Sequence, residues 1–213
     1  MPKATKNDVA NVSGGKGVAG GYLFRAPLGT AKPTGLDSKL DEAFEVCGFV
    51  SEDGIVFATE TDAEELVDMN GETMETSKTK HSETMTVTFA EVKEGTLAVQ
   101  YGGKNVADAD GVITVHVNGD EPDHWIYVFE GVLKNGRRWR RLIHDGKVTE
   151  MGDLTVASSE LMGREATVTA YKDPETGDYY TDWIESTETE KASEAAAKAA
   201  GRKAGAKKEA QDA

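Results

Sequence analysis

The stretch HWIYVFEGVLKNGRRWRRLIH, residues 124–144, decides the fold class. Two runs that are compatible with strands flank Asn135-Gly136, a pair that favours a tight reversal between antiparallel strands. The first run carries large apolar side chains at both parities. One face has Trp125, Tyr127 and Phe129, and the other has Ile126, Val128 and Val132. The sequence therefore predicts a central strand over residues 124–133, covered on both sides and paired with a strand over 137–144.

Further strands are predicted on both sides of this pair. Residues 84–92 alternate strictly, with Met85, Val87 and Phe89 on one face and threonines on the other, which is typical of a half-buried strand. The other predicted strands cover residues 22–26, 112–117, 164–171 and 179–184. Two hairpins are also predicted, one over residues 48–60 that turns at Asp53-Gly54 and one over 64–77 that turns at Asn70-Gly71.

Helical patterns are few. Leu36, Leu40, Ala43 and Phe44 have helical spacing, which predicts a short helix over residues 36–46. Residues 96–101 are compatible with a single helical turn. The fold class expected is mainly β, an antiparallel β-sandwich or partly open barrel with one short flanking helix.

The 213 residues divide into three segments by composition. Residues 1–21 are rich in glycine and lysine without periodicity and are interpreted as a flexible N-terminal arm. Residues 22–186 hold the predicted strands. Residues 187–213 form an alanine- and lysine-rich tail, interpreted as dynamic and partly helical because it lacks an apolar stripe.

Composition argues against several classes of protein. No apolar run approaches the roughly 20 residues of a membrane span, and the first 25 residues lack the apolar core of a secretory signal. We therefore expect a cytosolic product without a membrane partner. The single cysteine, Cys47, lies among apolar residues and is interpreted as a small buried side chain.

The net charge of −14 is unevenly distributed. Residues 36–75 contain thirteen acidic side chains and one lysine, whereas residues 134–147 contain six basic side chains and one aspartate. Such polarity suits self-association, in which an acidic surface of one copy meets a basic surface of the next. Solvated faces of a monomer explain it equally well.

The basic run around Trp139 invites comparison with nucleic-acid-binding segments. Strand alternation sends Arg138 and Arg140 to one face and Arg137 and Arg141 to the other, and the whole chain is strongly acidic. Long-range attraction to a polyanion is therefore absent. We interpret the four arginines as candidate residues of a subunit interface or of a salt-bridged strand.

Motifs for catalysis, metal binding or cofactor binding are not found in the sequence. His116 and His124 flank Asp120, Glu121 and Asp123, but the intervening Asn118-Gly119-Asp120 favours a turn over a metal site. Gly14-Gly15-Lys16-Gly17 lacks the Ser or Thr of a phosphate loop. We predict no enzyme activity, no cofactor and no metal.

Several phrases, taken in order, resemble the major tail (tail tube) proteins of long-tailed, non-contractile bacteriophages. These phrases are YLFRAPLGT at 22–30, GFVSEDGI at 48–55, YGGKNV at 101–106 and YKDP at 171–174. The resemblance covers residues 20–186. It implies six copies in a ring and rings stacked into a tube that conducts DNA from capsid to host. It also implies a virion tail protein made in the host cytoplasm, with tape measure and tail terminator proteins as partners.

The resemblance and the charge pattern together suggest a lumen. A channel that passes DNA without holding it needs acidic side chains, since basic ones bind phosphates with release of counterions. We predict that Asp68, Glu72 and Glu75 line the lumen on the hairpin 64–77, with a loop that reaches an adjacent ring as the alternative for residues 72–81. A capsid-decorating or host-surface-binding β-sandwich module is the alternative function.

Overall fold

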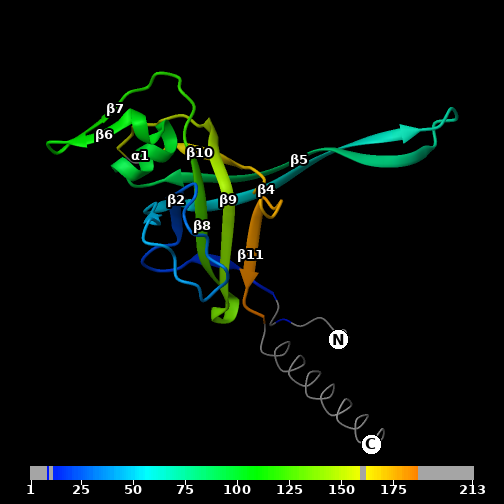
Figure 1. The fold of residues 1–213 in the computed structure, drawn as a ribbon, viewed down its shortest axis with the longest axis horizontal. Helices are drawn as coiled ribbons and strands as arrows, with labels where there is room; N and C mark the ends of the chain where they lie inside the picture. The colour runs from blue at the N-terminus through cyan, green and yellow to red at the C-terminus, as the bar shows by residue number, and fades with distance from the viewer. Residues whose placement is uncertain (1–8, 10–11, 159–161, 187–213) are drawn as a thin grey trace, which may run out of the picture.

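A computed structural model describes residues 9, 12–158 and 162–186 of the chain, and Figure 1 shows their arrangement. The described elements are, in chain order, β1 (Gly15–Gly17), β2 (Leu23–Pro27), β3 (Glu45–Val46), β4 (Val50–Val67), β5 (Thr73–Phe89), α1 (Glu94–Tyr101), the 3₁₀ turn Gly103–Asn105, β6 (Val106–Ala109), β7 (Val112–Val115), β8 (His124–Leu133), the 3₁₀ turn Lys134–Gly136, β9 (Arg138–Met151), β10 (Glu165–Ala170) and β11 (Tyr180–Ile184). The mainly β class with one short α-helix is confirmed.

A nine-stranded antiparallel sheet forms the body of the molecule. Its main path runs β3-β2-β8-β9-β10-β5-β4, while β1 extends along β8 and β11 along β9. The predicted hairpin across Asn135-Gly136 is confirmed as the β8–β9 pair. β8 is central as predicted, and β6 and β7 form a separate small hairpin beside α1.

Apolar side chains cover both faces of β8. One cluster gathers side chains from both ends of the sheet, including Leu23 of β2, Tyr127 of β8 and Met85 of β5. A smaller cluster on the other face contains Ile126, Val128 and Leu142. The rings of Phe57 on β4 and Phe129 on β8 lie 5.8 Å apart although their strands are not neighbours, so the sheet curls into a partly open barrel.

The helix predicted over residues 36–46 is wrong; this segment is a turn-rich loop that ends in β3. Local side chains compete for its backbone, because the Ser38 hydroxyl accepts hydrogen bonds from two preceding amides and Asp41 accepts one from Ala43. Leu40 and Phe44 still pack against the smaller cluster. The helical spacing therefore marked the buried side of a loop.

The hairpin predicted at Asp53-Gly54 is also wrong. β4 continues from Val50 to Val67, and the pairing with β5 passes from Val50↔Phe89 to Ile55↔Val87. Gly54 has a φ of +79° within this irregularity. The turn signal therefore marks a bulge in a continuing strand.

The N-terminal segment differs from its prediction, whereas the helical turn in the central segment agrees with it. Gly15–Gly17 belongs to the sheet as β1, although residues 1–21 were expected to be flexible throughout. The helical turn near residue 96 is confirmed as α1, and it buries Val99 against the larger cluster. The tail 187–213 lies outside the described residues.

Candidate interaction surfaces

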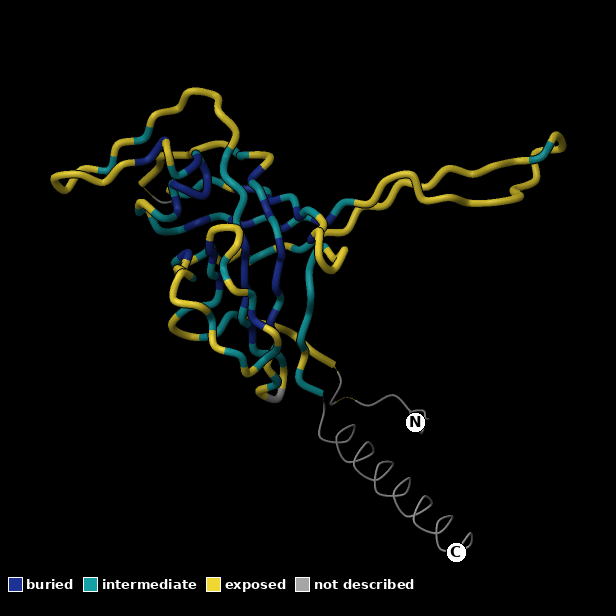
Figure 2. The backbone as a smooth tube through the Cα atoms, viewed as in Figure 1, coloured by how far each residue is buried: buried dark blue, intermediate teal, exposed yellow. Residues whose placement is uncertain are grey.

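A long two-stranded arm, defined here as residues 58–81, projects from the sheet (Figures 1 and 2). It consists of the distal parts of β4 and β5, whose pairs run from Thr61↔His81 to Val67↔Thr73. Every residue of the arm except Asp68 is exposed, whereas Met85, Val87 and Phe89 in the proximal part of β5 are buried as predicted. The arm therefore has two solvent-exposed faces.

The turn at the end of the arm is built by Asp68. Its carboxylate accepts hydrogen bonds from the backbone amides of Asn70 and Glu72, each at 2.8 Å. These bonds, first the one from Glu72, hold the pKa of Asp68 below its usual value. Gly71 has a φ of +84°, a conformation that favours glycine. The predicted turn at Asn70-Gly71 is confirmed.

The three acidic residues predicted to line a lumen lie at or beside this turn. Asp68 is intermediate in exposure, and Glu72 and Glu75 are exposed. The prediction assumed a hairpin with one face on the core, and that premise is wrong because both faces of the arm are exposed. The tip also carries exposed apolar side chains: Leu66, Val67, Met69 and Met74.

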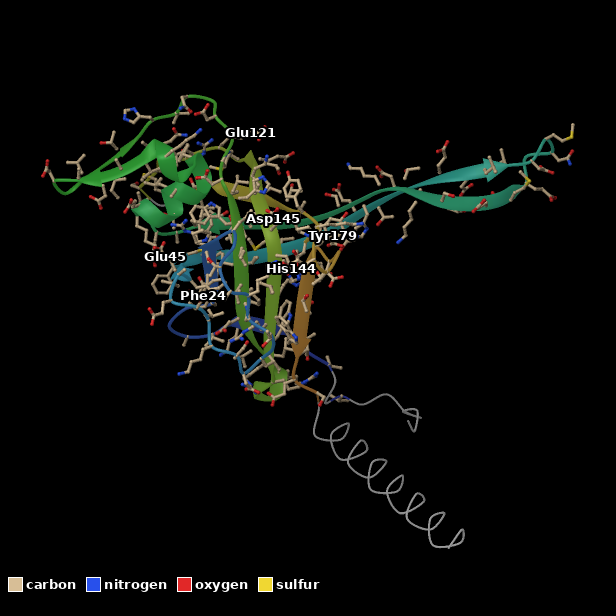
Figure 3. The ribbon with its side chains drawn as sticks, viewed as in Figure 1. Phe24, Glu45, Glu121, His144, Asp145 and Tyr179 are labelled. Atoms are coloured by element: carbon tan, nitrogen blue, oxygen red, sulfur yellow. The ribbon has the colours of Figure 1, made fainter. Side chains whose placement is uncertain are left out.

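Polar contacts hold the base of the arm. His81 contacts Thr61 through Nδ1 at 3.2 Å and Glu83 through Nε2 at 2.9 Å, and Thr59 donates a hydrogen bond to Glu83. Tyr179, which Figure 3 places where the arm leaves the sheet, lies against the His81 ring at a tilt of 53°. Its hydroxyl donates a hydrogen bond to the backbone carbonyl of His81. These contacts join both strands of the arm to the loop before β11.

The basic strand does not present all four of its arginines to solvent. Arg140 is 8% exposed and binds Glu130 together with the backbone carbonyls of Gly35 and Ser38. Arg141 makes two hydrogen bonds to Asp182 and lies 4.4 Å above the ring of Phe57. Both side chains are thus engaged within the chain.

The other two arginines lie nearer the surface. Arg138 is exposed and forms ion pairs with Asp37 at 2.7 Å and with Glu185 at 3.5 Å. Arg137 donates from Nε to the backbone carbonyl of Glu185. Arg138 and Arg140 contact the 35–38 loop on one face while Arg141 meets Phe57 on the other, as alternation predicted.

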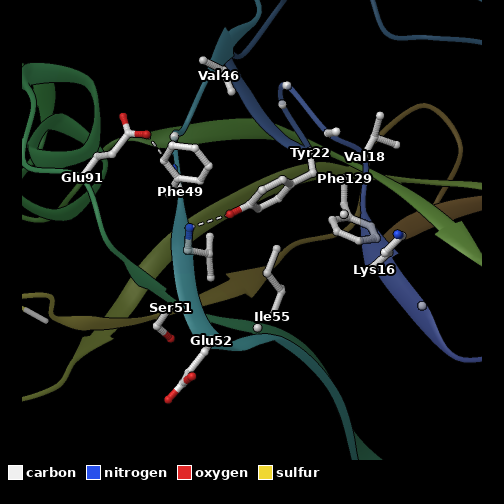
Figure 4. A pocket seen from close by; sticks show the side chains of 18 of the residues that line it. Lys16, Val18, Tyr22, Val46, Phe49, Ser51, Glu52, Ile55, Glu91 and Phe129 are labelled. Atoms are coloured by element: carbon white, nitrogen blue, oxygen red, sulfur yellow. Dashed lines mark hydrogen bonds between the residues drawn. The ribbon is translucent and has the colours of Figure 1, made fainter. Parts of the chain in front are cut away.

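A groove of about 850 Å³ opens where the barrel is incomplete (Figure 4). Its lining joins the β1 segment, Tyr22, the first residues of β4 and the aromatic side chains of Phe49, Phe129 and Trp139. The amide of Val50 donates to the Tyr22 hydroxyl at 2.6 Å across the gap. The hairpin predicted over residues 48–60 gave no indication of this groove, because it left no open edge there. In the sequence, the local feature that could have indicated the groove is Phe49, an aromatic residue beside Gly48 that is exposed in the structure.

Three of the acidic and histidine residues near position 120 are engaged by other groups. His124 pairs with Asp145, Glu121 with Lys147, and Asp123 accepts a hydrogen bond from the amide of Gly103. Within residues 9, 12–158 and 162–186, no group of three potential ligands gathers that could hold a metal ion.

Cys47 is buried as predicted, and burial raises the pKa of its thiol to about 12. In the part of the chain that the structure describes, no helix is both long and apolar enough to cross a membrane.

Comparison with known families gives one match. A family model described as "Phage tail tube protein" matches residues 6–197, which is most of the chain. A comparison with curated proteins found no match.

Proposed function

The chain belongs to a family of phage tail tube proteins, structural and non-enzymatic components of the virion tail, and from this premise we propose how it assembles. Six copies close into a ring, and rings stack into the tube that conducts DNA from the capsid to the host. Tape measure and tail terminator proteins are its further partners in the tail.

The exposed arm is the observation that carries this proposal. A two-stranded hairpin without a covering layer is at most marginally stable in water. The arm of this protein has no residue below intermediate exposure between positions 58 and 81, yet its base is held by Glu83, His81 and Tyr179. Because contacts hold the base of the arm while both of its faces are exposed, the arm is available to contact another copy.

The distribution of charge supports a tube that passes DNA. Residues 60–75 of the arm carry seven acidic side chains and no basic one. Acidic groups at a channel wall repel phosphates, while arginine or lysine there would bind them. We keep Asp68, Glu72 and Glu75 as the proposed lumen residues, and the half-buried Arg137 and the exposed Arg138 as the part of the proposed interface that reaches the surface.

Electron microscopy of the purified protein tests the proposal. We expect rings with sixfold class averages, or hollow tubes, whereas a variant in which residues 61–80 are replaced by a two-residue turn remains monomeric. A full-length protein that stays monomeric at every concentration and binds host cells contradicts the proposal and supports the host-binding alternative.

A further inference from the structure

The loop that joins β10 to β11 begins with the phrase YKDP at 171–174, and its aspartate is buried. Asp173 is 3% exposed. Its Oδ2 lies 3.0 Å from Nζ of Lys32 and 3.4 Å from Nδ1 of His144, and the Thr176 hydroxyl donates to it at 3.2 Å. A buried carboxylate costs free energy unless it is paired and hydrogen-bonded. Partners from three parts of the chain therefore hold Asp173 in place.

Asp173 also shapes the backbone of the turn that follows it. Its amide donates to the carbonyl of Asp178 at 2.9 Å, and its carbonyl accepts a hydrogen bond from the amide of Gly177 at 2.8 Å. These two bonds close the turn. The amide of His144 on β9 then donates to the carbonyl of Tyr179 at 3.3 Å. The turn therefore holds Tyr179 at a fixed position beside β9.

Tyr179 connects this turn to the arm. Its ring centroid lies 5.2 Å from that of His81, and its hydroxyl donates to the His81 carbonyl at 3.4 Å. The same ring packs against the larger apolar cluster, and Nζ of Lys172 lies 5.5 Å from its centroid. Figure 3 shows Tyr179 at the point where the arm leaves the sheet. The side chain is therefore anchored in the body of the molecule while it contacts the arm.

His81 connects Tyr179 to both strands of the arm. It lies on β5, opposite Thr61 of β4, and its Nδ1 is 3.2 Å from the Thr61 hydroxyl. Its Nε2 is 2.9 Å from Glu83, which is 8% exposed and accepts a hydrogen bond from Thr59. Beyond His81, the arm has no covering layer among the described residues. Contacts at its base therefore decide the direction in which the arm points.

We propose that Tyr179 is a positioning residue, which fixes through His81 the direction in which the arm leaves the sheet, and that the turn built by Asp173 holds Tyr179 in place. The inference rests on the proposed role of the arm in assembly, and it assigns a role to the YKDP phrase. An arm that keeps one direction loses less conformational entropy when it meets another copy. Tyr179 therefore favours assembly through the arm.

The direction of the arm can be measured in the full-length monomer. Spin labels at Met69→Cys in the tip and Glu150→Cys on β9 are both at exposed positions, whereas Cys47 is buried and stays unlabelled. The tip lies about 25 Å beyond Thr61, since a strand rises roughly 3.3 Å per residue, so a rotation of about 20° at the base moves the tip by about 9 Å. Pulsed electron paramagnetic resonance gives the distribution of distances between the two labels.

We expect one narrow distribution in the parent and, in Tyr179→Ala, a distribution that is broader by roughly 9 Å. Tyr179→Phe keeps the ring against His81 and restores the narrow distribution. Tyr171→Ala is the matched control and stays narrow, because Tyr171 begins the same loop but its ring lies 5.1 Å from that of His124. A merely structural role lowers the urea midpoint of Tyr179→Ala without broadening. A narrow distribution in Tyr179→Ala, or a broad one in the parent, overturns the proposal.

Double substitutions test the order of the contacts. His81→Ala broadens the distribution, and adding Tyr179→Ala broadens it no further, because Tyr179 acts through His81. Asp173→Asn removes the charge that pairs with Lys32, and it broadens the distribution of the parent but not that of Tyr179→Ala. Additive broadening in either pair overturns the corresponding step.

Assembly is measured separately, by light scattering of the unlabelled proteins. Tyr179→Ala is expected to assemble about five-fold more slowly than the parent, because its arm must be ordered on contact, while Tyr179→Phe and Tyr171→Ala assemble at the rate of the parent. Equal rates for Tyr179→Ala and the parent overturn the contribution to assembly. A parent protein that never assembles overturns the tube function, whereas the distance distributions of the monomer still decide whether Tyr179 positions the arm.

Discussion

At the scale of the residue, Arg140 and Arg138 have opposite environments although both belong to one face of one strand. Arg140 is buried among Glu130 and two backbone carbonyls, while the side chain of Arg138 is 49% exposed. A sequence pattern assigns the same surface to both. Only their exposure separates the arginine that is buried within the fold from the arginine whose ion pairs lie at the surface.

We expect Arg140→Met to lower the free energy of unfolding by about 2–4 kcal/mol, since it leaves the Glu130 carboxylate and the carbonyls of Gly35 and Ser38 without their donor. Arg138→Glu changes that free energy by less than about 1 kcal/mol, because exposed ion pairs contribute little. Urea unfolding of the monomer measures both. Equal effects of the two substitutions contradict this division.

If Arg138 belongs to the interface, Arg138→Glu also weakens assembly at low salt, and added salt reduces the difference from the parent. Light scattering across a salt series measures the effect. Assembly equal to that of the parent at low and at high salt removes Arg138 from the interface.

His144 makes stability depend on pH. The side chain is 5% exposed and contacts the Thr181 hydroxyl through Nε2 at 2.9 Å, while its Nδ1 lies 3.4 Å from Asp173. Burial, and next the positive charge of Lys32, lower the pKa of His144 from its usual 6.5, against the opposite effect of Asp173 and Asp178. At pH values just below the usual pKa, the imidazole therefore stays neutral in the folded state and is protonated in the unfolded state.

Because the unfolded state binds the extra proton, stability falls as the pH drops below about 6.5 and is regained above it. His144→Gln is expected to reduce this slope, which urea unfolding at about pH 5 and about pH 7.5 measures. An unchanged slope in the variant shows that other groups cause the dependence.

At the scale of the element, the arm is not part of the core on which folding depends, and its proposed role is in assembly. It buries no side chain, so the body of the sheet does not depend on its sequence beyond the base contacts of His81 and Glu83. Its tip combines acidic and apolar side chains without a clean division between faces. Substitutions of the acidic side chains alone therefore test the lumen, because they leave the apolar side chains of the tip in place.

For the lumen we expect Glu72→Lys with Glu75→Lys to slow or arrest DNA passage, because phosphates bind the introduced lysines. Asp68 is left unchanged, since its carboxylate builds the turn through the amides of Asn70 and Glu72. DNA ejection from phage that carry the double variant is the measurement, and Lys78→Glu with Lys80→Glu is the matched control. Unimpaired ejection with normal tubes excludes these two acids from the lumen.

At the scale of the whole molecule, the last strand among the described residues ends well before the end of the chain. β11 ends at Ile184, and the amide of Glu185 still donates to the carbonyl of Arg138. Among the described residues, both apolar clusters draw on positions between 22 and 183. We therefore predict that the core needs no contribution from the tail.

We expect a chain that ends at Ser186 to unfold within about 2 °C of the full-length protein, since no described core residue is removed. Thermal unfolding of the monomer by circular dichroism measures this. A larger fall in the midpoint contradicts the independence of the core from residues 187–213.

The sequence by itself determined the features that depend on neighbours along the chain. Asn135-Gly136 and Asn70-Gly71 specify reversals through the conformations that glycine permits, and the alternation in residues 84–89 specifies a strand with one buried face. Apolar residues on both faces of residues 124–133 placed β8 at the centre. Each of these patterns depends on residues that are close in the sequence and is compatible with one local structure.

Tertiary structure decided the features in which distant groups compete for the same residues. Arg140 takes the carbonyls of Gly35 and Ser38, which a helix over residues 36–46 would have used for its own hydrogen bonds. Pairing with β5 carries β4 through Gly54, where the local signal favoured a turn. The groove and the burial of Arg140 arise only when the sheet curls, because the residues that form them lie far apart in the sequence and meet through the barrel.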